Sequence, residues 1–284
     1  MFDLILENKS GNRLTFEMGS PFQVTEIVGL NPPTATINMS DVAMIDGAVF
    51  NSSKLQTRLI NVAFAIVEEP PKNRIEVYRV LKTKQPVRLF YKGDFRNVYI
   101  DGYVESIDIS YFEMIQVVTV AILCPDPYLK NAEEITEDLN SIVSRFHFPF
   151  ASTEAPQIVF GTKESGVTVE VPNNGDVECG MIIELHAAGA LANPKVYDYD
   201  SQEWIGLNIE MIAGDEITLD TRQGHKTATL LRDGIETSVF NKVLKNSTWL
   251  QLPPNGGKFY YQVEIGLQES LTVVFKHSNL FEGV

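Results

Sequence analysis

Regular interruption by turn-forming residues is the feature that most constrains the fold of this chain. From Val167 to Ile265, short runs that alternate apolar and polar residues end about every 8–12 residues at glycine, proline, asparagine or aspartate. Alternation with a period of two predicts β-strands that bury one face. No run in this half has the 3.6-residue period of an amphipathic helix. The second half therefore predicts an antiparallel β-sandwich or barrel.

One of these turns, Gly224-His225-Lys226-Thr227, looks like the end of a phosphate-binding loop. That loop needs a glycine, four further residues and Gly-Lys-Ser/Thr, with a helix after it whose N–H groups face the phosphate. With Lys226 as the lysine, Asp220 and His225 occupy the two glycine positions. The residues that follow alternate as in a strand. We therefore predict two strand reversals, at Gly224 and Gly234, and no nucleotide site.

The first half also predicts strands. Apolar alternation runs from Val98 to Ile109 with a change of phase near Ser106, and it resumes from Val118 to Ile122. This pattern predicts a long β-hairpin with a β-bulge near Ser106.

The segment from Lys72 to Lys84 has helical spacing instead. Asn73 is the expected N-cap, after two prolines, and Pro86 lies beyond the expected end. The segment carries one acid, Glu76, and five basic residues: Lys72, Arg74, Arg79, Lys82 and Lys84. Two interpretations stay open. These cations form a solvated helix face, or Arg74, Arg79 and Lys82 dock onto an acidic surface of a neighbouring copy.

A length of 284 residues predicts two domains at roughly 150 residues each. The sequence becomes acidic and weakly patterned after Asn131, so we place the boundary near residue 135, between domains 1–135 and 136–284. Cys124 and Cys179 then fall in different domains. A disulfide framework is not expected, and a reducing compartment fits.

The charge balance is acidic. Lys and Arg number 23 against 37 Asp and Glu, a net charge of −14, which argues against a protein that wraps nucleic acid. Two interpretations remain: the charge keeps a β-rich protein soluble, or it lets DNA pass without sticking. No run approaches the roughly 20 apolar residues of a membrane helix, and the start does not resemble a signal peptide.

Motifs for catalysis are missing from the sequence. It has neither a Gly-x-Ser-x-Gly elbow nor a His-Glu-x-x-His zinc motif, and its four histidines are dispersed. We predict no enzyme, no cofactor and no metal. Carbohydrate binding is the alternative, because Trp204 and Trp249 lie out of phase with the apolar residues of their strands. Either they form an exposed aromatic platform or they pack at a sheet edge.

An ordered series of short motifs runs through the chain. In the first half these are Gly29-Leu30-Asn31-Pro32-Pro33, Asp46-Gly47-Ala48-Val49-Phe50-Asn51-Ser52-Ser53, Arg58, Val87-Arg88-Leu89-Phe90-Tyr91, Tyr99-Ile100-Asp101-Gly102-Tyr103-Val104 and Cys124-Pro125-Asp126-Pro127-Tyr128. Looser marks follow at Asn174-Gly175, Gly214-Asp215, Asp220-Thr221, Asp233-Gly234 and Phe281-Glu282-Gly283-Val284. In this order they resemble the distal tail (Dit) proteins of siphophages that infect Gram-positive bacteria.

The resemblance implies a mainly β fold. The N-terminal domain would be a β-rich ring-forming domain with one helix, and the C-terminal domain a galectin-like antiparallel β-sandwich. The function would be that of a structural hub in the virion tail, made in the host bacterial cytoplasm.

Such hubs form a hexameric ring that joins the tail tube to the baseplate or tip and lets DNA pass. The implied partners are the tail tube protein, a tail tip or baseplate protein such as a tail-associated lysin, and receptor-binding machinery. Neither specific nucleic-acid binding nor membrane binding is implied. The alternative function is a carbohydrate-binding adhesion module of a tail, acting through the C-terminal sandwich.

Overall fold

The chain forms two compact units. The computed structural model describes residues 2–44, 46–138, 142–144, 161–163 and 168–284. The first unit comprises Met1–Ala132 and Leu280–Val284, and the second comprises Glu133–Asn279. The sequence instead predicts 280–284 in the second domain. The described residues are mainly β with one α-helix, as predicted, and none of their helices is long and apolar enough to cross a membrane.

A large antiparallel sheet builds the first unit, in the order β2-β1-β7-β8-β9-β6-β3, with β10 paired to β8 and β28 paired to β10. The strands are β1 (Asp3–Asn8), β2 (Arg13–Phe16), β3 (Phe22–Val28), β6 (Arg58–Ile66), β7 (Pro86–Lys92), β8 (Asn97–Ile109), β9 (Gln116–Cys124), β10 (Leu129–Asn131) and β28 (Leu280–Phe281). The ring centroids of Phe16 on β2 and Phe22 on β3 lie 6.0 Å apart, and both rings contact Phe64. The sheet therefore curls until its end strands meet around one apolar core.

The long hairpin of β8 and β9 is confirmed. The register between the two strands shifts between Val104 and Ser106, where the sequence predicts a β-bulge. The bulge explains why the buried residues change phase along β8.

Helix α1 (Pro70–Val80) differs from its prediction at both ends. It begins earlier because its first two positions are prolines, whose missing N–H groups would be unpaired there anyway. Asn73 is therefore not the N-cap; it lies inside the helix, and its side-chain amide donates to the Glu68 carbonyl. The helix ends before Pro86 because Leu81 turns into extended backbone and is buried.

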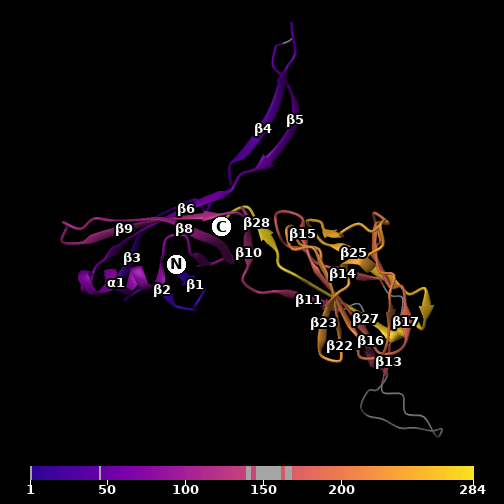
Figure 1. Cartoon of the computed structure of the whole chain (residues 1–284). Coiled ribbons are helices and arrows are strands. Elements are labelled where there is room, and N and C mark those ends of the chain that lie inside the picture. The colour runs from indigo at the N-terminus through magenta and orange to yellow at the C-terminus, as the bar shows by residue number, and fades with distance from the viewer. Residues whose placement is uncertain (1, 45, 139–141, 145–160, 164–167) are drawn as a thin grey trace. The chain divides into compact units, whose positions relative to one another are not determined.

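Strands β4 (Ala35–Asp41) and β5 (Ala48–Leu55) pair only with each other. They form a hairpin that projects away from the large sheet of the first unit (Figure 1). Every residue of the two strands is exposed except Thr36 and Leu55, which are half-buried.

Two facing sheets build the second unit as a sandwich. The larger has the order β11-β27-β16-β21-β22-β23 and the smaller has the order β14-β25-β18-β19. Their inner faces meet at Phe259 and Phe275, whose ring centroids lie 5.0 Å apart. The strands are β11 (Ile135–Asp138), β14 (Val169–Val171), β16 (Ile182–Ala187), β18 (Lys195–Asp198), β19 (Trp204–Gly206), β21 (Glu216–Asp220), β22 (Thr227–Arg232), β23 (Ile235–Ser238), β25 (Gly257–Gln262) and β27 (Leu271–His277).

Smaller elements complete the second unit. The short strands are β12 (Ile142–Ser144) with β13 (Gly161–Lys163), β15 (Cys179–Gly180) with β24 (Gln251–Leu252), and β17 (Leu191–Ala192) between β20 (Glu210–Met211) and β26 (Ile265–Gly266). Two single 3₁₀ turns, η1 (Phe240–Lys242) and η2 (Gln268–Ser270), lie in the loops.

The two predicted strand reversals are confirmed. Gly224 has φ 78°, and Asp233 and Gly234 have φ 52° and 77°. Because Arg232 pairs with Ile235, Asp233-Gly234 is a two-residue hairpin turn, the kind that needs positive φ at both positions. Strand β22 follows Lys226, so this stretch lacks the helix of a phosphate-binding loop.

Two stretches of apolar alternation in the sequence extend beyond the strands that the structure forms. Ile205, Leu207 and Ile209 do not share one strand: β19 ends at Gly206, and the Ile209 N–H donates to the Asn193 side chain rather than to a neighbouring strand. Strand β25 ends at Gln262, and Ile265 lies in β26 with 64% of its surface exposed. Residue 167, the first of a predicted strand, lies outside the described residues.

A buried imidazole leads to a pH prediction. His277 is 2% exposed, and within the described part of the chain its Nε2 has no hydrogen-bond partner. Burial lowers the pKa of His277 below its ordinary 6.5, while a hydrogen bond with the Pro172 backbone opposes the shift. The unfolded chain then binds more protons than the folded one below about pH 6.5, so stability falls as the pH drops.

We expect the free energy of unfolding of the second unit to fall below about pH 6.5 by at most about 1.4 kcal/mol per pH unit from this group. Urea unfolding of the full chain at several pH values checks this. His277→Gln should flatten the slope, whereas His225→Gln, at an exposed turn, should leave it unchanged. Equal slopes in the wild type and His277→Gln would contradict the assignment.

Candidate assembly interface

The β4–β5 hairpin exposes an apolar face. Met39 pairs with Phe50, and Ile37 lies two residues before Met39 on the same side. These three side chains are 54–61% exposed. A lone two-stranded hairpin is marginally stable in water, and grouped exposed apolar side chains mark interaction surfaces. This face is therefore suited to packing against another molecule.

The opposite face of the hairpin carries mostly polar side chains that bond to one another, together with Lys54 opposite Thr36 and Val49 opposite Ser40. Asn38 donates to Ser52 at 2.9 Å, Asn51 to Ser40 at 2.6 Å, and Gln56 to Thr36 at 2.8 Å. A register shift between Asn38 and Met39 leaves Asn51 as an extra residue. Phe50 and Ser52 therefore point to opposite faces although they are two residues apart. The hairpin is amphipathic across its two faces.

The predicted inter-subunit residues lie on or just after α1. Arg74 packs against the tip of the β8–β9 hairpin, with its guanidinium 5.3 Å from the Tyr111 ring centroid. The Tyr78 and Tyr111 hydroxyls lie 2.9 Å apart. Beside them, Phe112 and Met114 are 103% and 98% exposed. The helix face that carries Arg74 thus continues into an exposed apolar tip.

The other two predicted residues are unpaired cations. Arg79 and Lys82 are exposed and have no ion-pair partner among the residues that the structure describes. Lys72, by contrast, pairs with Glu69 at 2.6 Å. A contact between Arg74, Arg79 or Lys82 and a neighbouring copy remains a prediction.

Arg58 is a buried residue that hydrogen-bonds to several loops of the first unit. It is 3% exposed at the start of β6. Its Nε donates to the Pro127 carbonyl at 2.6 Å, and its Nη1 donates to the carbonyls of Gly29 and Asn31 at 2.9 and 3.0 Å. Its Nη2 donates to the Glu282 carbonyl at 2.7 Å. One guanidinium therefore holds three loop segments, which only arginine's fork of donors can do.

These three segments and Arg58 itself are four of the motifs that carry the family resemblance. Burial lowers the pKa of Arg58, while the nearby Cys124, Glu282 and Asp126 oppose the shift. Gly29 must be glycine, because φ is 102° and a Cβ there would collide with the Leu59 carbonyl. The sequence shows the motifs but not that they converge.

The two tryptophans lie at different places in the second unit. Trp204 on β19 is half-buried, and its ring centroid is 6.3 Å from that of Tyr197. Trp249 stacks on Phe240, with centroids 5.6 Å apart and planes at 20°. Both side chains point away from the core, as their phase predicts, but the structure does not bring them together as one aromatic platform.

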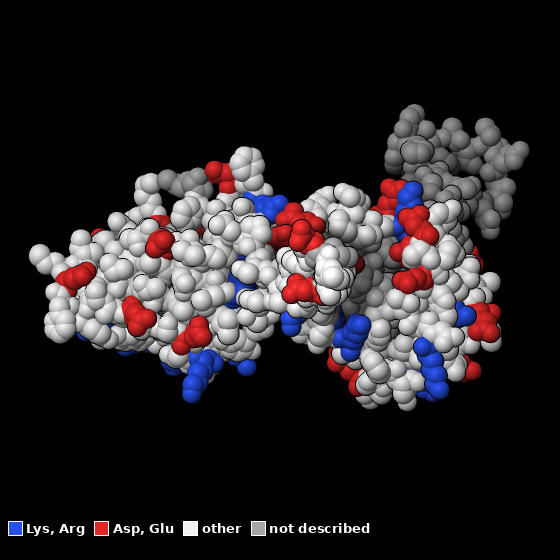
Figure 2. Space-filling view, turned by 90° about the horizontal axis from the view of Figure 1, so that it is seen from above, with Lys and Arg blue, Asp and Glu red and all other residues white. Residues whose placement is uncertain are grey.

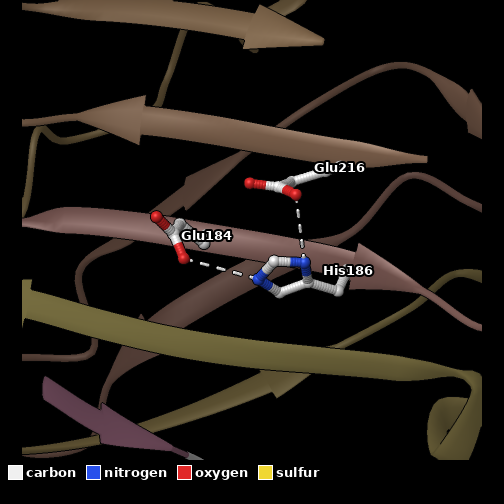
Figure 3. A group of neighbouring side chains, drawn as sticks. All are labelled: Glu184, His186 and Glu216. Atoms are coloured by element: carbon white, nitrogen blue, oxygen red, sulfur yellow. Dashed lines mark ion pairs between the residues drawn. The ribbon is translucent and has the colours of Figure 1, made fainter. Parts of the chain in front are cut away.

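The second unit also gathers a polar cluster that the sequence does not predict. Glu184 and His186 lie on β16 and Glu216 on the neighbouring β21 (Figure 3). His186 Nε2 is 3.4 Å from a Glu184 oxygen, and Nδ1 is 3.5 Å from a Glu216 oxygen. Lys276 on β27 pairs with Glu184 at 2.6 Å. The register of β16 with β21 places His186 opposite Glu216. The cluster can be predicted only when that register is known.

This arrangement suits an ion-pair network better than a metal. The cluster offers three ligand atoms within 4.8 Å of one another. A metal needs donors that converge on one point, but the two carboxylates face different nitrogens of one imidazole, and the Lys276 ammonium already neutralises Glu184. We therefore assign the cluster a structural role on the sheet surface.

Comparison with known proteins gives the class of the molecule. Residues 9–124 match the family model of the phage tail protein RIFT-related domain. None of the curated proteins matches the chain. Among solved structures, the chain resembles the Dit protein of phage SPP1, described as a paradigm of the hub adsorption apparatus in phages that infect Gram-positive bacteria. The TM-score is 0.70 at 16% identity, over 98% of this chain and 99% of that one.

Two structures of the phage p2 baseplate in its activated conformation, with Sr and with Ca, are also similar. Their TM-scores are 0.57 and 0.54, each at 12% identity over the full length of both chains. Residues 9–124 are thus similar to the phage tail RIFT-related domain, and the whole chain has the Dit fold. The matched proteins are structural components of phage tails rather than enzymes.

Proposed function

We propose that this protein is the structural hub at the distal end of a siphophage tail. In this proposal six copies form a ring that joins the tail tube to the baseplate or tip protein, and DNA passes through the ring. The observation that carries the proposal is the full-length Dit fold together with a phage tail domain at residues 9–124. The working location is the virion tail, after synthesis in the host cytoplasm.

The β4–β5 hairpin supports assembly of copies. Its apolar face, with Ile37, Met39 and Phe50, would be covered by an adjacent subunit, since burying it there removes apolar surface from water. Its polar face would then be free to line the central channel. Arg79 and Lys82 supply unpaired cations for an acidic neighbour in a chain whose net charge is −14.

Native mass spectrometry and negative-stain microscopy of the full chain test this proposal. We expect a ring of six copies, formed alone or after addition of the tail tube protein. A chain that stays monomeric both alone and with the tube protein would contradict it.

The ring is also expected not to retain DNA. On the described surface of each unit that Figure 2 shows, blue and red side chains are interspersed and form no continuous basic stripe of the kind that follows a nucleic-acid backbone. Filter binding of double-stranded DNA at low salt should show no retention by the ring. Ser52→Lys adds a second cation, beside Lys54, to the polar hairpin face and should create salt-sensitive retention. Tight binding by the unaltered ring would contradict the expectation.

A further inference from the structure

A row of aromatic side chains crosses the outer face of the smaller sheet of the second unit. Trp204 on β19 stands opposite Tyr197 on β18, and Tyr197 stands opposite Tyr260 on β25. Tyr199, at the end of β18, meets the Tyr260 ring edge-on at 6.3 Å and is 51% exposed. The opposite face of these strands holds the core residues Val196, Ile205, Phe259 and Tyr261.

We propose that this aromatic row binds a neutral oligosaccharide, with Trp204 as the main stacking surface. The C–H groups of a pyranose ring pack on an aromatic face, while its hydroxyls bond to polar groups at the margin. An aromatic surface with a few polar groups at its margin offers both the packing and the hydrogen bonds. This function is additional to the hub and does not depend on assembly of the ring.

Gly206 lets the Trp204 indole lie along the sheet. Gly206 follows Trp204 by two residues, so both belong to the same face of β19. A Cβ on Gly206 would lie 3.2 Å from the indole and 2.7 Å from the Lys195 side chain. Because Gly206 has no side chain, the indole and the Lys195 methylene stem occupy the space where its Cβ would lie. The Lys195 ammonium lies 5.4 Å from the ring centroid.

The two neighbouring tyrosines differ from Trp204 in how they can contact a sugar. The Tyr197 and Tyr260 rings stack on each other, with centroids 4.9 Å apart and planes at 6°. Their faces are therefore partly occupied, and they extend the row chiefly through ring edges and hydroxyls. The Tyr260 hydroxyl lies 3.4 Å from the Gln202 amide oxygen, which places neutral hydrogen-bonding groups at the edge of the row.

The composition of this face favours a sugar over a protein partner. Its outward positions hold no aliphatic side chain: they are Glu170, Lys195, Tyr197, Trp204, Gly206, Lys258, Tyr260 and Gln262. Tryptophan and tyrosine occur in both protein and sugar contacts, so the absence of aliphatic neighbours is what favours the sugar. The Lys258 and Glu170 pair at 2.9 Å cancels charge at one margin. Lys195 is one further cation, with its ammonium over part of the Trp204 ring. The other contacts that the row offers are uncharged, so we assign the ligand class as a neutral glycan.

Titration of the full chain with neutral oligosaccharides tests the proposal. An array of glucose-, galactose-, rhamnose- and N-acetylglucosamine-containing oligosaccharides identifies the probe, and isothermal titration calorimetry measures its affinity for each variant. Trp204→Ala should weaken binding roughly tenfold, whereas Trp249→Ala should retain it.

Two further variants distinguish the loss of a binding residue from misfolding caused by Trp204→Ala. Gly206→Ala keeps the tryptophan but displaces it, and Tyr199→Ala removes an exposed ring at the end of the row. Both should weaken binding of the same oligosaccharide. The proposal is overturned if no oligosaccharide on the array binds, or if binding is equal in Trp204→Ala, Tyr199→Ala and Trp249→Ala.

Discussion

Arg58→Met is expected to lower the free energy of unfolding of the first unit by about 3–5 kcal/mol. The substitution keeps most of the apolar volume but removes the guanidinium from the carbonyls of Gly29, Asn31, Pro127 and Glu282. Part-buried carbonyls that lose a charged donor are costly, and each of these belongs to a segment that Arg58 holds in place. Urea unfolding with hydrogen exchange on β6 and β9 peptides measures the first unit separately.

Arg88→Met is the matched control for that prediction. Arg88 also makes two hydrogen bonds, to Asp101 at 2.6 and 3.0 Å, but its side chain is 44% exposed. A surface pair of this kind contributes about 0–1 kcal/mol. Arg58→Lys should recover only part of the loss, because one ammonium cannot reach all four carbonyls. Similar losses for Arg58→Met and Arg88→Met would show that Arg58 has no special role.

Phe50→Lys is expected to prevent assembly while leaving the folded monomer intact. Phe50 is 61% exposed in the single chain, so the lysine causes no clash there. In the proposed ring it would bury an unpaired ammonium in an apolar contact, which is strongly unfavourable. Light scattering on a size-exclusion column measures the change from ring to monomer, and far-UV circular dichroism checks the fold.

Ser52→Lys carries the same substitution on the opposite face of the same strand. It should leave the ring intact, because that face lines the channel in our proposal. If Ser52→Lys breaks the ring and Phe50→Lys does not, the two faces of the hairpin have been assigned the wrong way round. If neither variant changes the mass, the hairpin is not part of the interface.

Local patterns predicted much of the fold. Alternation located most strands of the sandwich, Asp233-Gly234 predicted a tight turn, and the phase change near Ser106 predicted a bulge. These features depend on residues close together in the sequence. The predicted start of α1 is wrong because the two prolines occupy the first positions of the helix rather than precede it.

The sites depend on pairing between distant segments, which a single sequence does not show. Trp204 was a candidate, but Tyr197 and Tyr260 join it only through the registers of β18 with β19 and β25. Arg58 was noticed as a motif, but its partners are backbone carbonyls, which have no sequence signature. The hairpin's two faces follow from Asn51 being the extra residue, which alternation alone does not reveal.

The pairing of β10 with β28 makes the second unit an insertion within the first. The chain leaves the first unit after Ala132 and returns at Leu280, and the flanking strands are held together by the pairs Leu129–Phe281 and Lys130–Leu280. Both junctions are thus fixed by the first unit itself. The residues between them can be exchanged for another folded module, or for a short turn, without opening the large sheet. We expect that exchange of this insertion would leave unchanged the part proposed to build the ring.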